Sequence, residues 1–166
     1  MGMHLIIAAI MALGGLAWAI NQLLNGAADA KGAVRRLKWQ HRHGKDLVAA
    51  IDDPRIAAVI LLGQLMRYEG EIGASDRDRL AEIVEKDLRT PTHEAQEIVA
   101  QALYILGQRN DAANELSKLL LPIRDACTPE ERADLLRLMN DIAARNGEIS
   151  PMQQILLDRT RQRMMD

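Results

Sequence analysis

The sequence predicts an all-α protein of 166 residues, in which a single N-terminal transmembrane helix precedes a bundle of about six to seven helices. Phe is absent and there are only two Tyr and two Trp, so that Leu, Ile, Ala and Met must fill the core. Such side chains suit the packing of helix on helix better than a sheet. Alternating Val/Ile/Thr runs closed by Asn-Gly or Asp-Gly turns, which would indicate strands, are missing.

The transmembrane helix is predicted from the first apolar segment. Leu5–Ile20 contains sixteen successive residues without a polar side chain, and two further leucines follow Asn21 and Gln22. Twenty residues of α-helix reach about 30 Å, which matches the hydrocarbon thickness of a bilayer. We therefore expect residues 1–25 to form a membrane anchor.

A basic segment, expected over residues 26–49, sets the orientation of this anchor. The chain has six basic residues and no acid between positions 31 and 45, namely Lys31, Arg35, Arg36, Lys38, Arg42 and Lys45. Because such residues accumulate on the cytoplasmic side of a span, we expect a single-pass protein of a bacterial-type inner membrane, with its N-terminus outside and its C-terminal domain in the cytoplasm. The six bases are also candidates for binding anionic headgroups of the lipid bilayer.

Other interpretations of the apolar segment stay open. Ala17-Trp18-Ala19 resembles a signal-peptide cleavage site, although no basic residues precede the segment, and a buried or interfacial helix is a third alternative. Small residues share one face of the segment at Ala8, Ala12, Gly15 and Ala19. Such faces allow close pairing of membrane helices, so that a homodimer through the anchor is one expectation, although small residues are also common in spans without pairing.

Three helices are expected in the first part of the body, which should span residues 50–166. The first covers Ile56–Met66 before a break at Gly70, and the second covers Ser75–Leu88 with apolar residues at helical spacing. Thr90-Pro91 should open the third helix as a cap followed by proline at the first helical position, and Gly107 should end it.

Three more helices are expected to follow. The fourth should run over Asp111–Ala126, with Pro122 kinking it or ending it early. Thr128-Pro129-Glu130-Glu131 is a capping box that starts the fifth helix, and Asn146-Gly147 should end it. A second capping box, Ser150-Pro151-Met152-Gln153, starts the last helix.

Two of the corners between these helices repeat the same pattern, 77 residues apart. The first corner reads Glu69-Gly70-Glu71-Ile72-Gly73-Ala74-Ser75-Asp76, and the second reads Asn146-Gly147-Glu148-Ile149-Ser150-Pro151-Met152-Gln153. In each, glycine suits the positive φ after a helix end, isoleucine can fill the gap below the turn, and a small residue can cap the next helix. The last residue of each corner, Asp76 or Gln153, can accept a hydrogen bond from the backbone of that cap. A duplicated helical hairpin would explain the repeat.

The two corners and the apolar helix before the first resemble those of the TerB tellurite-resistance family. They also resemble the related N-terminal domain of DjlA-type membrane co-chaperones, whose anchor and basic segment have the same layout. The resemblance covers roughly residues 50–165 and implies a membrane-tethered, non-enzymatic interaction or scaffold module, in envelope or metal/tellurite stress. We expect no J-domain in this sequence, because His93-Glu94-Ala95 is not the His-Pro-Asp motif.

The resemblance also suggests a metal site, since acids in these corners have been proposed to bind a divalent cation. The candidates are Glu69, Glu71 and Asp76, because the second corner has the neutral Asn146 and Gln153 instead. An EF-hand does not fit either corner, because neither has the alternating acids of its loop. A divalent-metal-binding protein, or an enzyme that uses the acidic corner, is therefore the alternative function.

No other motif in the chain points to catalysis. We find no paired nucleophile and base and no phosphate-binding loop, so that no catalytic or cofactor-binding residue is expected. The single Cys127 fits a reducing compartment. From Asp46 onward there are 22 acidic and 15 basic residues, a net charge of −7, which argues against nucleic acid as a partner. An unidentified cytoplasmic or membrane protein is the expected partner.

Overall fold

The computed structural model describes residues 46–165, and every regular element in this range is helical. The helices are α2 (Pro54–Arg67), α3 (Ala74–Lys86), α4 (Thr92–Gly107), the 3₁₀ turn η1 (Ala112–Glu115), α5 (Leu116–Ala126), α6 (Pro129–Ala144) and α7 (Pro151–Met165). The prediction of an all-helical body is therefore confirmed. The predicted anchor over 1–25 and the six basic residues from Lys31 to Lys45 lie outside the described residues. Within 46–165, no helix is both long and apolar enough to cross a membrane.

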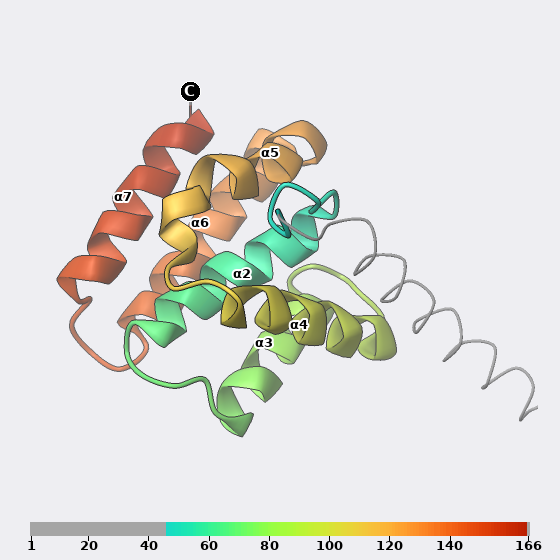
Figure 1. The fold of residues 1–166 in the computed structure, drawn as a ribbon, viewed down its shortest axis with the longest axis horizontal. Coiled ribbons are helices and arrows are strands. Elements are labelled where there is room, and N and C mark those ends of the chain that lie inside the picture. The colour runs from blue at the N-terminus through green and yellow to red at the C-terminus, as the bar shows by residue number, and fades with distance from the viewer. Residues whose placement is uncertain (1–45, 166) are drawn as a thin grey trace, which may run out of the picture. The chain divides into compact units, whose positions relative to one another are not determined.

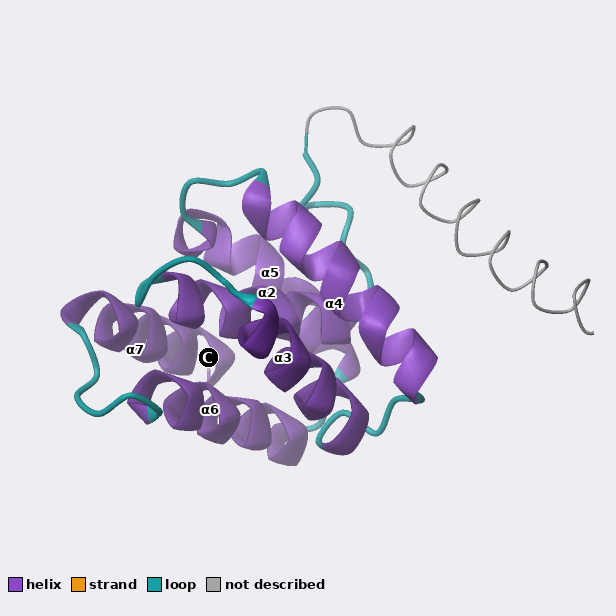
Figure 2. Ribbon diagram, turned by 90° about the horizontal axis from the view of Figure 1, so that it is seen from below, coloured by secondary structure: helices purple, strands orange, loops and turns teal. Residues whose placement is uncertain are grey.

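Helix α2 forms the centre of the body. Every residue from Ile56 to Met66 is buried, since other helices surround α2. Helices α3 and α4 pack on one side of α2, and α5 and α6 pack on the other, while α7 lies against α5 and α6 (Figure 1, Figure 2). This position explains why the sequence of α2 is apolar all around rather than along one stripe.

Helices α2 and α4 approach each other closely at Gly63. A Cβ atom added at Gly63 would lie 3.0 Å from Leu106 Cδ2 and 3.5 Å from Leu103 Cδ2. The same atom would lie 3.7 Å from Cδ1 of Ile72, in the first corner. The missing side chain therefore lets α4 and the first corner pack directly against the backbone of α2.

Several predicted helix starts are confirmed by their hydrogen bonds. The Thr128 hydroxyl accepts from the Glu131 amide at 3.2 Å, and the Glu131 carboxylate accepts from the Thr128 amide at 2.8 Å. The start of α4 differs from the expectation, because Pro91 is the cap and α4 begins at Thr92. Thr90 is instead buried, where its hydroxyl donates to the Leu88 carbonyl at 3.2 Å.

The fourth predicted helix is divided differently from the expectation. Its first turn is the 3₁₀ turn η1, and α5 begins at Leu116 and continues to Ala126, past Pro122. The prediction that Pro122 could end the helix early is therefore wrong. Because α5 starts only at Leu116, Pro122 lies in its second turn and is buried against the core together with Ile123.

The segment before α2 belongs to the packed body. Val48 and Ile51 are buried, and the Asp53 carboxylate caps α2 by accepting from the Arg55 amide at 2.9 Å. At the start of the described chain, the Asp46 carboxylate accepts from Lys118 Nζ at 2.6 Å. Residue 46 is therefore held against α5.

Candidate functional site

The two repeated corners have the same local geometry. Gly70 and Gly147 have φ angles of +154° and +114°, as predicted from their positions after helix ends. The amide of Gly73 donates to Asp76 Oδ2 at 2.9 Å, and the amide of Ser150 donates to Gln153 Oε1, also at 2.9 Å. These bonds confirm that Gly73 and Ser150 are the cap residues. They also confirm that the side chains of Asp76 and Gln153 accept from the cap amides.

The corners also contact each other, which the sequence did not predict. Oε2 of Glu69 accepts from Asn146 Nδ2 at 2.6 Å, and these two residues occupy equivalent positions of the two copies. Oε1 of Glu69 accepts from Gln153 Nε2 at 2.9 Å. Gln153 is fully buried, and its Nε2 also donates to the Leu65 carbonyl at 3.1 Å, so that it joins the start of α7 to α2. The repeated corners therefore form one polar cluster.

Arg145 holds the acids of this cluster together. Its guanidinium lies 2.9 Å from Glu69 Oε2 through Nη2 and 2.7 Å from Asp76 Oδ1 through Nη1. The three side chains are only 26%, 19% and 21% exposed. The amide of Gly73 and the guanidinium of Arg145 lower the pKa of Asp76. Arg145 was not predicted from the sequence, where its only signal is its position directly before the second corner.

The predicted metal candidates are only partly brought together. Glu69 and Asp76 converge, but on the guanidinium of Arg145, which supplies the positive charge between them. Glu71 is exposed and borders a pocket on the other side of the corner. Within residues 46–165, no group of three or more His, Cys, Asp or Glu residues is placed to hold a metal ion. A metal at Glu69 and Asp76 would have to displace Arg145.

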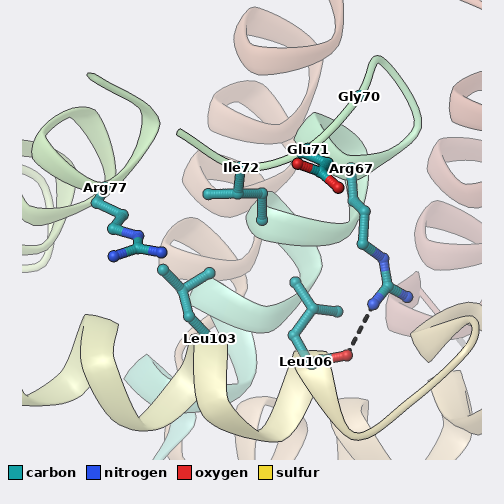
Figure 3. A pocket seen from close by; sticks show the side chains of 8 residues that line it. Arg67, Gly70, Glu71, Ile72, Arg77, Leu103 and Leu106 are labelled. Carbon is teal, nitrogen blue, oxygen red and sulfur yellow. Dashed lines mark hydrogen bonds between the residues drawn. The ribbon is translucent and has the colours of Figure 1, made fainter. Parts of the chain in front are cut away.

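That pocket has a volume of about 460 Å³ and lies between the first corner and the end of α4 (Figure 3). Its lining residues are Arg67, Gly70, Glu71, Ile72, Arg77, Leu103, Leu106 and Gly107. In Figure 3, Ile72 faces Leu103 and Leu106 across the pocket, and Arg77 and Arg67 lie at opposite ends. The pocket therefore combines apolar walls with charged ends, within the size range of pockets for small ligands.

Arg67 is fully used by the fold. Its guanidinium donates to the carbonyls of Leu106 at 2.7 Å and of Arg109 and Asn110 at 2.8 Å each. It also donates to Gln64 Oε1 at 2.7 Å. These carbonyls lie in the last turn of α4 or just after it, where backbone acceptors lack helical partners. Arg67 is thus a structural cap for α4 rather than a group available to a ligand.

A second pocket continues the first along α3 and α4. It has a volume of about 550 Å³ and is lined by Arg77, Asp78, Ala81, Gln96, Val99, Ala100, Leu103 and Tyr104. Because Arg77 and Leu103 line both pockets, we treat the two as one surface feature, the α3–α4 groove. Tyr104 is 48% exposed at its rim. Arg77 is also exposed, and its side chain pairs with no acid among the described residues.

Neither the groove nor the corner cluster contains an activated nucleophile. Cys127 is half-buried, and desolvation with the nearby Glu131 charge raises the pKa of its thiol, which makes a thiolate less accessible at neutral pH. Burial and a hydrogen bond to Asp111 raise the pKa of Tyr68 to about 12, so that its hydroxyl remains a donor. His93 is exposed at the start of α4.

The family model described as "Tellurite resistance protein TerB" matches residues 55–164. This range runs from the start of α2 almost to the end of α7 and includes both corners, Arg145 and the α3–α4 groove. No curated protein and no solved structure shows a significant match. The family match covers well over half of the chain and agrees with the all-helical fold, so that the chain belongs to the TerB family of tellurite resistance proteins.

Proposed function

We propose that this protein is a membrane-tethered, non-enzymatic interaction module, whose TerB body binds a cytoplasmic protein through the α3–α4 groove. The observation that carries the proposal is the contrast between the two polar features of the body. The acids of the corner cluster are engaged by Arg145, whereas Arg77 and Tyr104 leave their polar groups free at an open groove.

The composition of the groove favours a polypeptide as its ligand. Ala81 on α3 and Ala100 on α4 are small residues that line the groove, while Leu103 and Tyr104 offer apolar contact. Arg and Tyr are the residue types enriched at the centres of protein interfaces. The occupant we propose is an amphipathic segment that places apolar side chains on Leu103 and a carboxylate against Arg77.

Tethering is supported by the sequence before the described residues. A sixteen-residue apolar run followed by six bases without an acid is typical of a single span with its following domain in the cytoplasm. Membership of the TerB family supports a role in tellurite resistance or a related envelope or metal stress. A groove at the cytoplasmic side would recruit its partner to the membrane.

Site-specific photocrosslinking in cells tests the groove. A photoreactive amino acid replaces Tyr104 in the groove or, as the matched control, Ile155, which is 49% exposed on α7. We expect a discrete adduct with a protein partner from position 104 that Arg77→Glu abolishes, and none from position 155. The proposal is wrong if the two positions give the same adducts, or if Arg77→Glu leaves the position-104 adduct unchanged.

A further inference from the structure

We infer that Arg145 positions the binding surface of the α3–α4 groove, because it holds both ends of a loop that forms part of the groove wall. This loop comprises residues 70–73, between α2 and α3, and we name it the corner loop. Arg145 itself does not line the groove. Its positioning role rests on the proposed function, since it controls the surface through which a partner would bind.

The corner loop belongs to both polar features of the body. On one side, Gly70, Glu71 and Ile72 line the pocket at the end of α4 (Figure 3). On the other side, Glu69, which directly precedes the loop, is a member of the corner cluster. A displacement of the loop would therefore change the shape of the pocket.

Few other contacts fix the corner loop and the first turns of α3. No residue from Gly73 to Arg79 is buried, and the first buried side chain of α3 is that of Leu80. Among residues 46–165, the amides of Glu71 and Ile72 donate no hydrogen bond to another residue. Segments with so few buried and hydrogen-bonded groups are the ones that open locally at low cost. Arg77, the base that the groove offers to a partner, lies within this stretch.

Arg145 supplies the contacts that this stretch otherwise lacks. Its Nε donates to Glu69 Oε2 at 3.0 Å, and its Nη1 donates to Asp76 Oδ1 at 2.7 Å. Glu69 precedes the corner loop, and Asp76 directly precedes Arg77 and also accepts from the Gly73 amide at 2.9 Å. Because a guanidinium holds its partners in a fixed planar geometry, one side chain fixes both ends of the loop.

The link originates in a different part of the body from the groove. Arg145 directly follows α6, which packs on α2 and α7, whereas α3 packs mainly on α4 and α2. The second corner therefore reaches the groove through the side chain of Arg145. By thermodynamic linkage, a partner that binds the ordered groove should in turn stabilise the contacts of Arg145.

Hydrogen–deuterium exchange of the full chain in detergent tests this link without a partner. Arg145→Ala is compared with Ile123→Val, which shortens a buried side chain on α5 and lowers stability through the core, outside both corners. We expect the amides of residues 70–79 to exchange on the order of tenfold faster in Arg145→Ala and to stay close to wild type in Ile123→Val. Arg145→Lys should give an intermediate rate, and it replaces Arg145→Ala in all comparisons if the alanine variant does not fold.

Photocrosslinking from position 104 in cells tests the consequence for binding. At equal protein levels, Arg145→Ala should reduce the adduct that depends on Arg77 severalfold more than Ile123→Val does. Equal exchange of residues 70–79 in the two variants, or equal adduct, would overturn the positioning role of Arg145. A wild-type chain without an adduct that depends on Arg77 would instead contradict the proposed function, and the exchange rates alone would then decide the role of Arg145.

Discussion

Arg145 is the residue on which the corner cluster depends most. It contacts Glu69 and Asp76 in a partly buried setting, through separate nitrogen atoms. Arg145→Ala should lower the free energy of unfolding by about 1–2 kcal/mol. Two charge-assisted contacts are lost, and Glu69 and Asp76 are left without the positive charge between them. Urea denaturation measures this change.

The matched control is Arg137→Ala, which removes an ion pair between Arg137 and Asp134. Both side chains of this pair are 66% exposed. Such exposed pairs contribute about 0–1 kcal/mol. Arg145→Lys should restore only part of the loss, since an ammonium cannot reproduce the fork of the guanidinium. Equal effects of Arg145→Ala and Arg137→Ala would show that the cluster is no more than a surface ion pair.

A metal at the first corner is the alternative that Arg145 argues against. We expect calorimetric titration with Ca²⁺, Mg²⁺ or Zn²⁺ to show no micromolar binding by the wild-type body, because the guanidinium already occupies the space between Glu69 and Asp76. If micromolar binding is observed and disappears in the Glu69→Gln/Asp76→Asn variant, the first corner is a metal site and this interpretation is wrong.

The lowered pKa of Asp76 predicts a pH dependence. Its carboxylate is stabilised by the Gly73 amide and by Arg145, so that it adds stability at pH values above its unfolded pKa of about 3.9. That contribution is lost as the pH falls through the lower folded pKa. Asp76→Asn should therefore cost stability at pH 7 and much less at pH 3, by urea denaturation at both values. An equal cost at both values would exclude the charge as the cause.

At the level of elements, the glycine of the second corner allows the chain to turn from α6 into α7. Gly147 has φ +114°, with no other atom within 4 Å of an added Cβ, so that only backbone strain opposes substitution. Gly147→Ala should lower stability by about 1–2 kcal/mol. Gly107→Ala is the control, because its position is equally open and its φ is not positive. Thermal unfolding of both variants provides the comparison, and equal melting temperatures would contradict the strain.

The elements were largely predictable from the sequence because their signals are local. Thr128 and Glu131 bond to each other across three residues, and Gly147 acts within its own turn, so that adjacent residues determine these features. The sequence left open whether Pro122 would kink the fourth helix or end it, and only the early end is excluded, because α5 continues to Ala126. The 3₁₀ turn that shifts the start of α5 to Leu116 was not predicted from local patterns.

The candidate site was less predictable, because its contacts join distant parts of the chain. Glu69 and Asp76 were recognised as acids of a corner, but their partner Arg145 lies 76 and 69 residues away. The α3–α4 groove likewise exists only after Arg77 and Leu103 meet across two helices. A repeat detected in the sequence indicated two similar corners, and only the fold shows that they contact each other.

For the whole molecule, we propose that different parts of one chain have different tasks. In this proposal the N-terminal residues provide attachment to the membrane, whereas the TerB body provides a buried α2, a corner cluster that stabilises it and an open groove. The net charge of −7 from Asp46 onward disfavours close contact between most of the body and an anionic membrane. A body of this kind therefore needs a tether to remain at the membrane.

The most direct test of the central claim is the topology of the full chain in bacterial cells. A reporter active only outside the cytoplasm is fused after Asp166, a cytoplasmic reporter is fused at the same position as the control, and membranes are separated from the soluble fraction. We expect a silent outer reporter, an active cytoplasmic reporter, and a full chain that stays with the membranes while residues 46–166 do not. An active outer reporter, or a full chain in the soluble fraction, would contradict the membrane-tethered interaction module.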